Sequence, residues 1–360
     1  MISLFCAMLL VPGILFLWNP KKWSLQRRKT KLIGDDVSLS IIIPARNEEK
    51  NLERLLSSLE LSTLRPLEII VVDDDSNDGT SNVAERFNTK LLRLVDKPSG
   101  WLGKSYACHI GAQAAQGSHF VFLDADVTIH PNFFETLLGN CTENPGVYSV
   151  QPFHAIEEKW ENFASLLNLM VVAGISNFGY GEDGNSKSGA YGPCQLFEAK
   201  IYNKLLPHEN AREVILEDVK IGQQVSQFGF PMYNRLGGNL LQFRMYSEGF
   251  SEMTQGFAKG FAQGANATPP IKMLYSVLWL IGAIQITSLV LFSPSIMAIL
   301  VYLAFAFQFH SLFKAIGKFH ILTALLFPIP IFYFFYVQAL SWWQWKVRKT
   351  TTWKGRSIHV

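Results

Sequence analysis

Four long apolar blocks flank a central region in which short apolar runs alternate with polar segments. The blocks cover residues 2–18, 274–292, 296–309 and 321–340. A helix needs about 20 apolar residues to cross the hydrocarbon core of a bilayer. The second and fourth blocks are long enough by this measure, whereas the third is long enough only if it continues to about Ala315.

This pattern predicts a membrane-bound part and a water-soluble part. The predicted segments are an N-terminal transmembrane anchor over 1–20, a soluble domain over 38–268, a C-terminal transmembrane region over 272–345 and a basic tail over 346–360. A chain of 360 residues with 49% hydrophobic content is large enough for one domain of ordinary size in addition to these spans.

The start of the soluble region predicts a parallel βαβ unit. Residues 39–44 are β-branched and end in proline, which is typical of a buried strand, and residues 67–72 form a second such run. Between them, leucines recur at the spacing of an amphipathic helix, for which Asn47 is the predicted N-cap. Two strands joined by a helix, without a hairpin signal, indicate a parallel, right-handed unit.

Further elements are expected downstream. Residues 121–127 read as a buried strand, 131–138 as a helix that begins with proline, and 147–151 as another strand. Residues 163–172 are strongly apolar and helical but short for a span. We interpret them as an interfacial helix at a membrane surface, with a core helix as the alternative.

Two carboxylates end the 121–127 strand one residue apart. Side chains at positions i and i+2 of an extended segment point to the same side, so Asp124 and Asp126 can face one object together. At the carboxyl end of a strand in an open α/β sheet, where ligands bind, that object is expected to be Mg²⁺ or Mn²⁺. These cations combine one or two carboxylates with substrate phosphates. The sequence therefore predicts a metal diphosphate, and a solvated loop is the alternative.

The second strand is followed by an acidic turn over residues 73–80. The first turn of the sheet contains neither the G-x-G-x-x-G pattern nor a P-loop, so a nucleotide would be held by this acidic turn instead. Carboxylates there can accept hydrogen bonds from a base or ribose. Lys104 follows a glycine at a predicted helix start, and we expect it to contact the diphosphate.

Clusters of basic residues predict how the chain is oriented across the membrane. No basic residue precedes the first apolar block, which argues against a cleaved signal peptide. The basic residues that follow it are Lys21, Lys22, Arg27, Arg28, Lys29 and Lys31. Positive charge on this side places the soluble domain in the cytoplasm. Three later crossings would then put the basic tail outside, against the same rule, so residues 327–330, which contain two prolines, are proposed to belong to a re-entrant block.

The remaining composition excludes several functions. The net charge of +3 is explained by these juxtamembrane clusters, so no nucleic-acid partner is needed. The four cysteines are dispersed without a C-x-x-C pair, which predicts neither a zinc site nor a disulfide framework. The eight histidines lack the H-E-x-x-H spacing of metal hydrolases.

Three motifs together resemble the family-two glycosyltransferases, which have the GT-A fold. They are SIIIPARNEE at residues 40–49, EIIVVDDDSNDGT at 68–80 and FLDADV at 122–127, in the order of that family. The resemblance implies a Rossmann-like, mixed but mostly parallel α/β sheet. It also implies a nucleoside pocket lined by Pro44, Ala45, Glu48 and Asp74, and a metal held by Asp124 and Asp126.

The acidic pair Glu217–Asp218 matches the acidic dipeptide of that family, which implies that Asp218 is the catalytic base. On a helix the two side chains diverge by about 100°, so a matched acid–base pair is not expected. A single base fits an inverting displacement, because a metal can neutralise the departing nucleotide. The family's Gln-x-x-Arg-Trp pattern is missing at residues 255–260, where Lys259 is the cation expected near the diphosphate.

Further segments are GKSYAC at residues 103–108, SVQPFH at 149–154, FRMYSEGF at 243–250 and WKGR at 353–356. With them, most of the chain resembles one group within the family, the membrane enzymes that glucosylate C30 carotenoid acids in staphyloxanthin-type pathways of Gram-positive bacteria. This resemblance implies transfer of glucose from UDP-glucose to a carboxylate, at the cytoplasmic face of the cell membrane. Other lipid acceptors, namely polyprenyl phosphate, diacylglycerol or a hydroxylated lipid, are alternatives. A non-catalytic membrane scaffold is a further alternative.

Overall fold

The computed structural model describes residues 2–16, 23–25, 34, 37–175, 178–179, 185–348, 350–353 and 356–359. The chain divides into two compact units. An α/β unit contains Ser24–Phe153 and Gly184–Arg244, and a helical unit contains Met1–Trp23, His154–Asp183 and Met245–Val360. Residues 154–183 and 245–268, which belong to the predicted soluble domain, therefore group with the helical unit.

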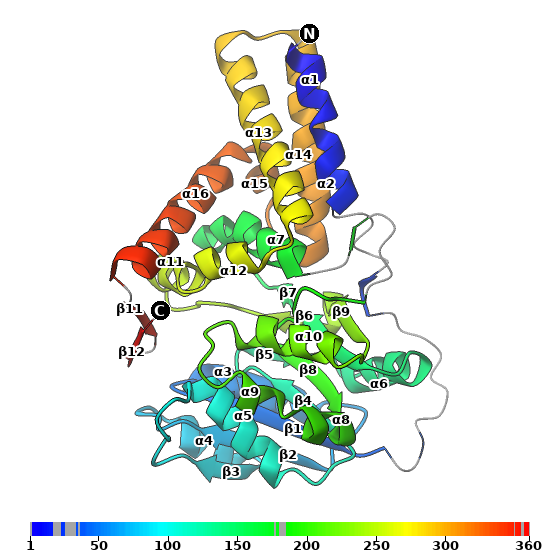
Figure 1. The fold of residues 1–360 in the computed structure, drawn as a ribbon, viewed down its shortest axis with the longest axis vertical. Coiled ribbons are helices and arrows are strands. Elements are labelled where there is room, and N and C mark those ends of the chain that lie inside the picture. The colour runs from blue at the N-terminus through cyan, green and yellow to red at the C-terminus, as the bar shows by residue number, and fades with distance from the viewer. Residues whose placement is uncertain are drawn as a thin grey trace. The chain divides into compact units, whose positions relative to one another are not determined.

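The α/β unit is built on a seven-stranded sheet with the order β3-β2-β1-β4-β8-β6-β9 (Figure 1). The strands are β1 (Leu39–Ala45), β2 (Glu68–Asp73), β3 (Lys90–Arg93), β4 (His119–Leu123), β6 (Val147–Gln151), β8 (Cys194–Glu198) and β9 (Met232–Leu236). Strands β3, β2, β1 and β4 are parallel, β8 is antiparallel to both of its neighbours, and β6 is parallel to β9. The predicted mostly parallel sheet is confirmed.

This strand order decides where a ligand can bind. The chain runs outward from β1 to β2 and β3, then returns to β4 on the other side of β1. Ligands of open α/β sheets bind beyond the carboxyl ends of the strands at such a reversal. The segments that follow Ala45, Asp73 and Leu123 share this edge of the sheet.

Helices cover the sheet where apolar residues recur at helical spacing. Leu52, Leu55, Leu56 and Leu59 are the buried residues of α3 (Glu49–Glu60). The other helices of this unit are α4 (Thr80–Arg86), α5 (Gly103–Ala114), α6 (Phe133–Glu143), α8 (Ala199–Leu205), α9 (Pro207–Asn210) and α10 (Glu217–Gln227). A core cluster that includes Ile42, Cys108 and Phe122 lies between sheet and helices.

Two local predictions are wrong. Asn47 is not the N-cap of α3; Glu48 is, and Asn47 has a left-handed backbone (φ 52°). The Asn47 N–H instead donates to Ser76 Oγ (2.9 Å), so this residue ties the first turn of the sheet to the acidic turn. The predicted strand over 121–127 is also interrupted, because β4 ends at Leu123 and β5 (Val127–Ile129) begins after a turn.

A smaller sheet of three strands has the order β5-β10-β7, formed with β10 (Leu241–Phe243) and β7 (Phe153–His154). Strand β10 is antiparallel to β5, and the pairing aligns Phe243 with Val127. The turn that contains Asp124 and Asp126 is thus bounded by a strand of each sheet.

The helical unit contains the apolar blocks. Its helices are α1 (Ile2–Met8), α2 (Leu10–Phe16), α7 (Ala164–Ile175), α11 (Phe250–Ala258), α12 (Phe261–Ala267), α13 (Pro270–Phe292), α14 (Ile296–Ile316), α15 (Ile321–Leu325) and α16 (Pro328–Trp343). A two-stranded ribbon of β11 (Thr350–Trp353) and β12 (Arg356–His359) follows. Helix α7 buries eight of its twelve residues, as expected of the core-helix alternative.

Helices α1 and α2 pack beside α13 and α14 (Figure 1). The Trp279 indole donates to Gln308 Oε1 (2.8 Å), and Gln308 Nε2 donates to the Leu10 carbonyl (3.2 Å). Gly13 permits this approach, because a Cβ there would lie 2.7 Å from Trp279 Nε1. The first apolar block is therefore a partner of the later ones.

Two helices are long and apolar enough to cross a membrane among the described residues, namely α13 with 23 residues and α14 with 21. The third apolar block thus continues to Ile316, as its crossing required. The fourth block was expected to be long enough to cross, but it is broken into α15 and α16 around Pro328 and Pro330. The basic residues predicted to orient the anchor, from Lys21 to Lys31, lie outside the described residues.

Candidate active site

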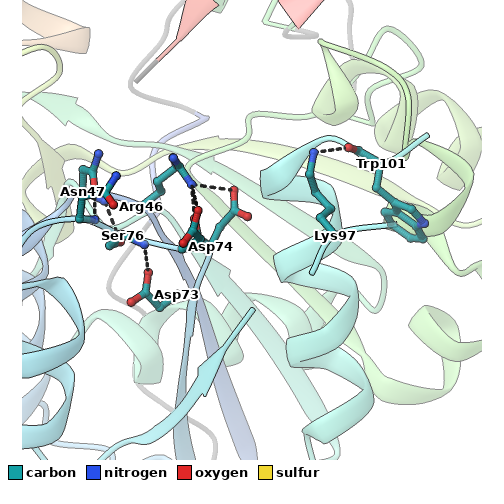
Figure 2. A network of polar contacts seen from close by, with 9 residues as sticks. Arg46, Asn47, Asp73, Asp74, Ser76, Lys97 and Trp101 are labelled. Carbon is teal, nitrogen blue, oxygen red and sulfur yellow. Dashed lines mark hydrogen bonds and ion pairs between the residues drawn. The ribbon is translucent and has the colours of Figure 1, made fainter. Parts of the chain in front are cut away.

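Hydrogen bonds of Asp73, its first residue, fix the conformation of the acidic turn that follows β2. Asp73 Oδ1 accepts from the Ser76 N–H (3.0 Å; Figure 2), and Asp73 Oδ2 accepts a short hydrogen bond from the Ser81 hydroxyl. Asp75 has a left-handed backbone (φ 58°) and a side chain that is 60% exposed. Asp73 therefore shapes the turn, and Asp74 and Asp75 are the carboxylates that it presents.

Arg46 reaches these carboxylates from the end of β1. Its guanidinium donates to the Asp74 carbonyl and lies 4.0 Å from Asp74 Oδ2 and 3.7 Å from Asp75 Oδ2 (Figure 2). The Asp74 N–H donates to the Ala45 carbonyl (2.9 Å). Side chains of Arg46 and Asp74 are only 17% and 10% exposed, so water screens this pair weakly.

The predicted nucleoside residues Pro44, Ala45, Glu48 and Asp74 lie at this sheet edge or directly after it. Ala45 is the last residue of β1. Glu48 is the N-cap residue of α3, without a side-chain capping hydrogen bond, and its N–H donates to Thr80 Oγ1 (2.8 Å). The Glu48 carboxylate accepts from Asn51 Nδ2 (2.7 Å). These residues frame the acidic turn, and their contact with a nucleoside stays a prediction.

Gly103 brings the acidic turn against the start of α5. A Cβ on this residue would overlap Asp74 Oδ2, so only glycine allows the carboxylate to lie there. Lys104 is the next residue along the helix. The carboxylate expected to contact the nucleoside and the lysine expected to contact the diphosphate are thus neighbours in space.

Lys104 is surrounded by carboxylates. Its ammonium lies 2.7 Å from Asp124 Oδ1, 2.9 Å from Asp124 Oδ2 and 3.4 Å from Glu217 Oε1. Burial disfavours the charge on Lys104, but Asp124 and Glu217 outweigh it and raise the pKa of Lys104 well above its usual value. This lysine is therefore a cation at physiological pH.

Asp124 and Asp126 lie in the turn between β4 and β5, not on a strand as predicted. The Asp124 N–H donates to the Pro193 carbonyl (3.0 Å), and the Asp126 carbonyl accepts from the Arg244 N–H (3.4 Å). Alternation along a strand therefore does not apply to the pair. The turn instead fixes both residues between the large and the small sheet.

The donor set at this turn fits a hard divalent cation that shares its shell with substrate. In the part of the chain that the structure describes, no group of three or more His, Cys, Asp or Glu side chains could hold a metal ion. Mg²⁺ and Mn²⁺ use one or two carboxylates together with substrate phosphates, which is what Asp124 and Asp126 offer. Metal binding by this pair remains a prediction.

Asp218 lies at the first turn of α10, beside Gly192. A Cβ on Gly192 would lie 3.1 Å from Asp218 Oδ2 and 3.3 Å from Lys104 Nζ, so this glycine keeps the space between the two groups open. Burial and the adjacent Glu217 raise the pKa of Asp218 to about 7, although Lys104 acts against them. A carboxylate with this pKa can exchange a proton near neutral pH.

The structure thus joins four predicted site residues, Asp74, Lys104, Asp124 and Asp218, around the start of α5. Lys259 is at the end of α11 in the helical unit, and its contact with the diphosphate stays a prediction. His208 is a core residue, because it is buried against Phe122 and bonded to the Tyr202 hydroxyl (2.9 Å).

Four residues of this site were not predicted. Arg46 and Glu217 belong to the sequence motifs without a predicted role of their own, and no pattern marks Gly103 or Gly192 as a site residue. The signal for Arg46 was present, since a basic residue in the first turn faces the acidic turn of a parallel neighbour. No sequence signal joins Lys104 to Glu217, because they come from distant segments.

Together these groups suit the binding of a nucleoside diphosphate and its departure as a leaving group. Carboxylates at the acidic turn suit base or ribose donors, a lysine at a helix start suits phosphate, and two carboxylates suit a bridging cation. A sheet of this order with carboxylates and a lysine at its carboxyl edge is the arrangement of a GT-A glycosyltransferase.

Comparisons with known proteins agree with this class. The sequence model of Glycosyl transferase family 2 matches residues 40–206. The 4,4'-diaponeurosporenoate glycosyltransferase of Staphylococcus aureus strain N315 is 33% identical over 343 residues, which cover 92% of this chain and 91% of that protein. The same enzyme of strain USA300 is 33% identical over 333 residues, which cover 90% and 88%.

Among solved structures, the mannosyltransferase PcManGT from Pyrobaculum calidifontis, in complex with GDP-Man and Mn²⁺, has a TM-score of 0.57. It is 15% identical and covers 95% of this chain and 98% of its own. The chain belongs to glycosyltransferase family 2 and is a glycosyltransferase. The expected family and GT-A fold are confirmed, and the scaffold alternative is wrong.

Proposed function

We propose that this protein is a membrane-bound inverting glycosyltransferase that moves glucose from UDP-glucose to the carboxylate of a C30 carotenoid acid such as 4,4'-diaponeurosporenoate. The product would be a glucosyl ester. The observation that carries the proposal is the similarity to enzymes of that name along almost the whole chain, 92% of it, and not only in the α/β unit.

Each site residue has a role in this reaction. Pro44, Ala45, Glu48 and Asp74 hold the nucleoside, with Arg46 fixing the Asp74 carboxylate. Lys104 contacts the diphosphate from the start of α5, and Asp124 and Asp126 hold Mg²⁺ or Mn²⁺. The metal, when bound, neutralises charge on the departing diphosphate, so the chain needs no acid for the leaving group.

The acceptor decides how much the base matters. A carboxylic acid with a pKa of about 4.3 is already ionised at neutral pH, whereas a hydroxyl must lose its proton during attack. General-base help is worth roughly 10² to 10⁴ in rate, and this contribution should largely vanish for a carboxylate. For a carotenoid acid, Asp218→Asn should therefore cost much less activity than Asp126→Ala.

The membrane attachment follows from helix lengths and charge. Helices α13 and α14 are each long enough to cross, and the first apolar block packs beside them. The two crossings by α13 and α14 return the basic tail to the side of the catalytic unit. This topology satisfies the positive-inside rule, which three C-terminal crossings would violate. The catalytic unit is accordingly cytoplasmic.

A second function has one observation in its favour. The raised pKa of Asp218, about 7, is near the value that suits a general base, which only an alcohol acceptor requires. A hydroxylated lipid or diacylglycerol would then replace the carotenoid acid. Polyprenyl phosphate, which is anionic like a carboxylate, would not require that base.

The test is expression in a host that makes the C30 carotenoid acid, followed by mass analysis of the pigments. The proposal expects a gain of one hexose in a form that mild alkali releases, because esters are cleaved by base. The Asp126→Ala variant should give none, and Arg86→Gln, which changes an exposed ion pair on α4, should behave like the unchanged chain. Hexose gained only by an alcohol or phosphate lipid would contradict the carotenoid acid as acceptor.

A further inference from the structure

The fourth apolar block is long enough in sequence to cross a bilayer but does not fold as one helix. No charged residue lies between Lys318 and Lys346. The block forms α15, with 5 residues, and α16, with 16 residues. Each is shorter than the about 20 residues that a crossing requires.

The break between the two helices lies against the middle of α14. The Phe327 ring is 4.7 Å from the ring of Tyr302 and 5.0 Å from that of Phe309. The Tyr302 hydroxyl donates to the Leu325 carbonyl (2.7 Å). At a rise of 1.5 Å per residue, Phe309 lies about 10 Å and Tyr302 about 21 Å from the end of α14 at Ile316, in a helix about 32 Å long, so the break stops short of the far end of that helix.

The block starts and ends at the same end of the α13–α14 pair. It starts next to the last residue of α14, where the His320 N–H donates to Asn162 Oδ1 (2.8 Å). It ends on the helices that lead into α13: Ser341 Oγ accepts from the Ala262 N–H (2.9 Å), and Gln344 Nε2 donates to Gln255 Oε1 (2.9 Å).

Helices α13 and α14 are joined by residues 293–295 and are antiparallel, as the stacking of Trp279 on Phe309 shows (4.5 Å). The first residue of α13 and the last of α14 therefore share one end of the pair. Within the helical unit, α16 slopes from α15 toward α11 instead of running beside α13 along its length (Figure 1).

We propose that α15 and α16 form a re-entrant hairpin that sits in one leaflet of the bilayer, contacts lipid with the exposed face of α16, and does not cross. This inference rests on the membrane attachment proposed above and adds a lipid-binding surface to it.

The exposed face of α16 has the composition of a lipid contact. Its exposed large side chains are Ile329, Phe332, Phe335, Tyr336, Trp342 and Trp343. Phe332 is 73% exposed, whereas Ile331 and Val337 on the other face are buried within the unit. Helices α13 and α14 of the same unit also expose apolar side chains, such as Leu274 and Phe307. An apolar face of this extent beside two spanning helices fits acyl chains.

The end of α16 has the composition of a headgroup contact. Arg348 lies over the Trp343 ring (4.3 Å), and Lys346 lies over the Trp345 ring (3.7 Å). Tryptophan gathers at membrane interfaces, and the nearby cations suit the anionic lipids of a cytoplasmic leaflet.

Charge along the sequence also favours a hairpin. Lys314 and Lys318 precede the block, Lys346 and Arg348 follow it, and the α13–α14 link over residues 293–295 has no charge. A crossing would separate the two cationic pairs by a bilayer. The hairpin keeps both pairs on one side, as the positive-inside rule requires.

The test is single-cysteine labelling of the full chain in membrane vesicles of both orientations, with a maleimide that does not cross membranes. The variants are Lys318→Cys before the hairpin, Phe332→Cys on its exposed face, Val347→Cys after it, and Ser293→Cys in the α13–α14 link. The native cysteines Cys6, Cys108, Cys141 and Cys194 are buried, and the unmodified chain measures their background.

The hairpin predicts that Lys318→Cys and Val347→Cys are labelled from the same side, Ser293→Cys from the opposite side, and Phe332→Cys from neither. Labelling of Val347→Cys from the side of Ser293→Cys would overturn the hairpin and leave the attachment intact. Labelling of Ser293→Cys from the side of Lys318→Cys would overturn the attachment itself. Labelling of Phe332→Cys from water would overturn the lipid contact.

A second measurement needs no substitution in the block. A reporter that is fluorescent only in the cytoplasm, fused after Val360 of the full chain, should fluoresce. Activity of alkaline phosphatase fused at the same place, which requires export, would place the tail outside and overturn the hairpin.

Discussion

The ionised side chain of Asp218 lowers the stability of the folded protein. Its carboxyl is buried beside the negative charge of Glu217, which raises its pKa to about 7, whereas an aspartate in an unfolded chain titrates near about 3.9. Between these values the folded protein binds a proton that the unfolded chain does not. The contribution of Asp218 to stability is therefore present below about pH 4 and is lost as pH rises through about 7.

Asp218→Asn should consequently stabilise the protein more at pH 8 than at pH 5, by about 1 to 3 kcal/mol, because it removes a charge that the folded protein buries only at the higher pH. The measurement is thermal unfolding of the full chain in detergent with a chelator and no nucleotide. An equal change in melting temperature at both values of pH would contradict the raised pKa.

Arg46 is expected to act through Asp74. Arg46→Gln removes the cation that lies 4.0 Å and 3.7 Å from the Asp74 and Asp75 carboxylates. We expect the KM for the sugar nucleotide to rise about tenfold, which is roughly 1.4 kcal/mol, with little change in kcat. Steady-state kinetics measure this.

Arg86→Gln is the matched control for Arg46→Gln. Arg86 pairs with Glu53 at 2.9 Å, but both side chains are about half exposed, and exposed pairs contribute little. If both variants changed KM alike, the effect would come from net charge and not from the fixing of Asp74.

At the residue scale, the sequence predicted several residues of the site but not which of them contact one another. Lys104 and Asp124 were predicted because a lysine stands at a helix start and a carboxylate at a strand end, whereas Asp74 and Asp218 were predicted from motifs that resemble those of the family. The pairing of Lys104 with Glu217 could not be predicted, because contacts between distant segments depend on the packing of α5 against α10. The proline and glycine signals located turns but not which side chains those turns bring together.

At the scale of elements, the start of α5 organises the site. It brings Gly103 against Asp74 and Lys104 against Asp124, while the loop before β8 brings Gly192 between Lys104 and Asp218. Both glycines are needed because side chains pass close to their Cα atoms, and neither has the backbone conformation that favours glycine.

Substitution of the two glycines by alanine is expected to weaken sugar-nucleotide binding to different extents. Gly103→Ala should weaken sugar-nucleotide binding at least about tenfold, because its Cβ would overlap Asp74 Oδ2, without loss of melting temperature, because alanine favours helix. Gly192→Ala should have a smaller effect, since its Cβ would lie 3.1 Å from the nearest atom. Calorimetric titration with UDP and Mn²⁺ measures both. A stronger effect of Gly192→Ala would contradict the geometry at α5.

Most elements were predictable from periodicity, since α3 buries the leucines that predicted it and β1 and β2 pair in parallel as expected. The errors fall where local signals compete. The turn at 124–126 interrupts an apolar run that looked like one strand, and two prolines split a run that looked like one span. In both places the apolar pattern predicted burial correctly, but it did not predict where the backbone leaves the strand or the helix.

At the scale of the whole molecule, the account requires that the catalytic unit and the lipid acceptor meet at one membrane face. The helical unit contributes two helices that are long and apolar enough to span a membrane and, in our proposal, a hairpin in the same leaflet as the acceptor's carboxylate. Length and hydrophobicity predicted the long apolar helices α13 and α14, but not the division of the fourth block into α15 and α16, because a continuous helix and a broken one can have the same composition.

The central claim is that glucose is transferred to a lipid carboxylate with metal held by Asp124 and Asp126. The most direct measurement is product formation by the purified full chain in lipid nanodiscs with UDP-glucose, Mn²⁺ and 4,4'-diaponeurosporenoate, read by mass spectrometry. The account predicts an ester that carries one hexose, its loss in Asp126→Ala or with chelator, and substantial formation by Asp218→Asn. Equal, severe losses in Asp126→Ala and Asp218→Asn, or transfer only to a hydroxylated lipid, would contradict it.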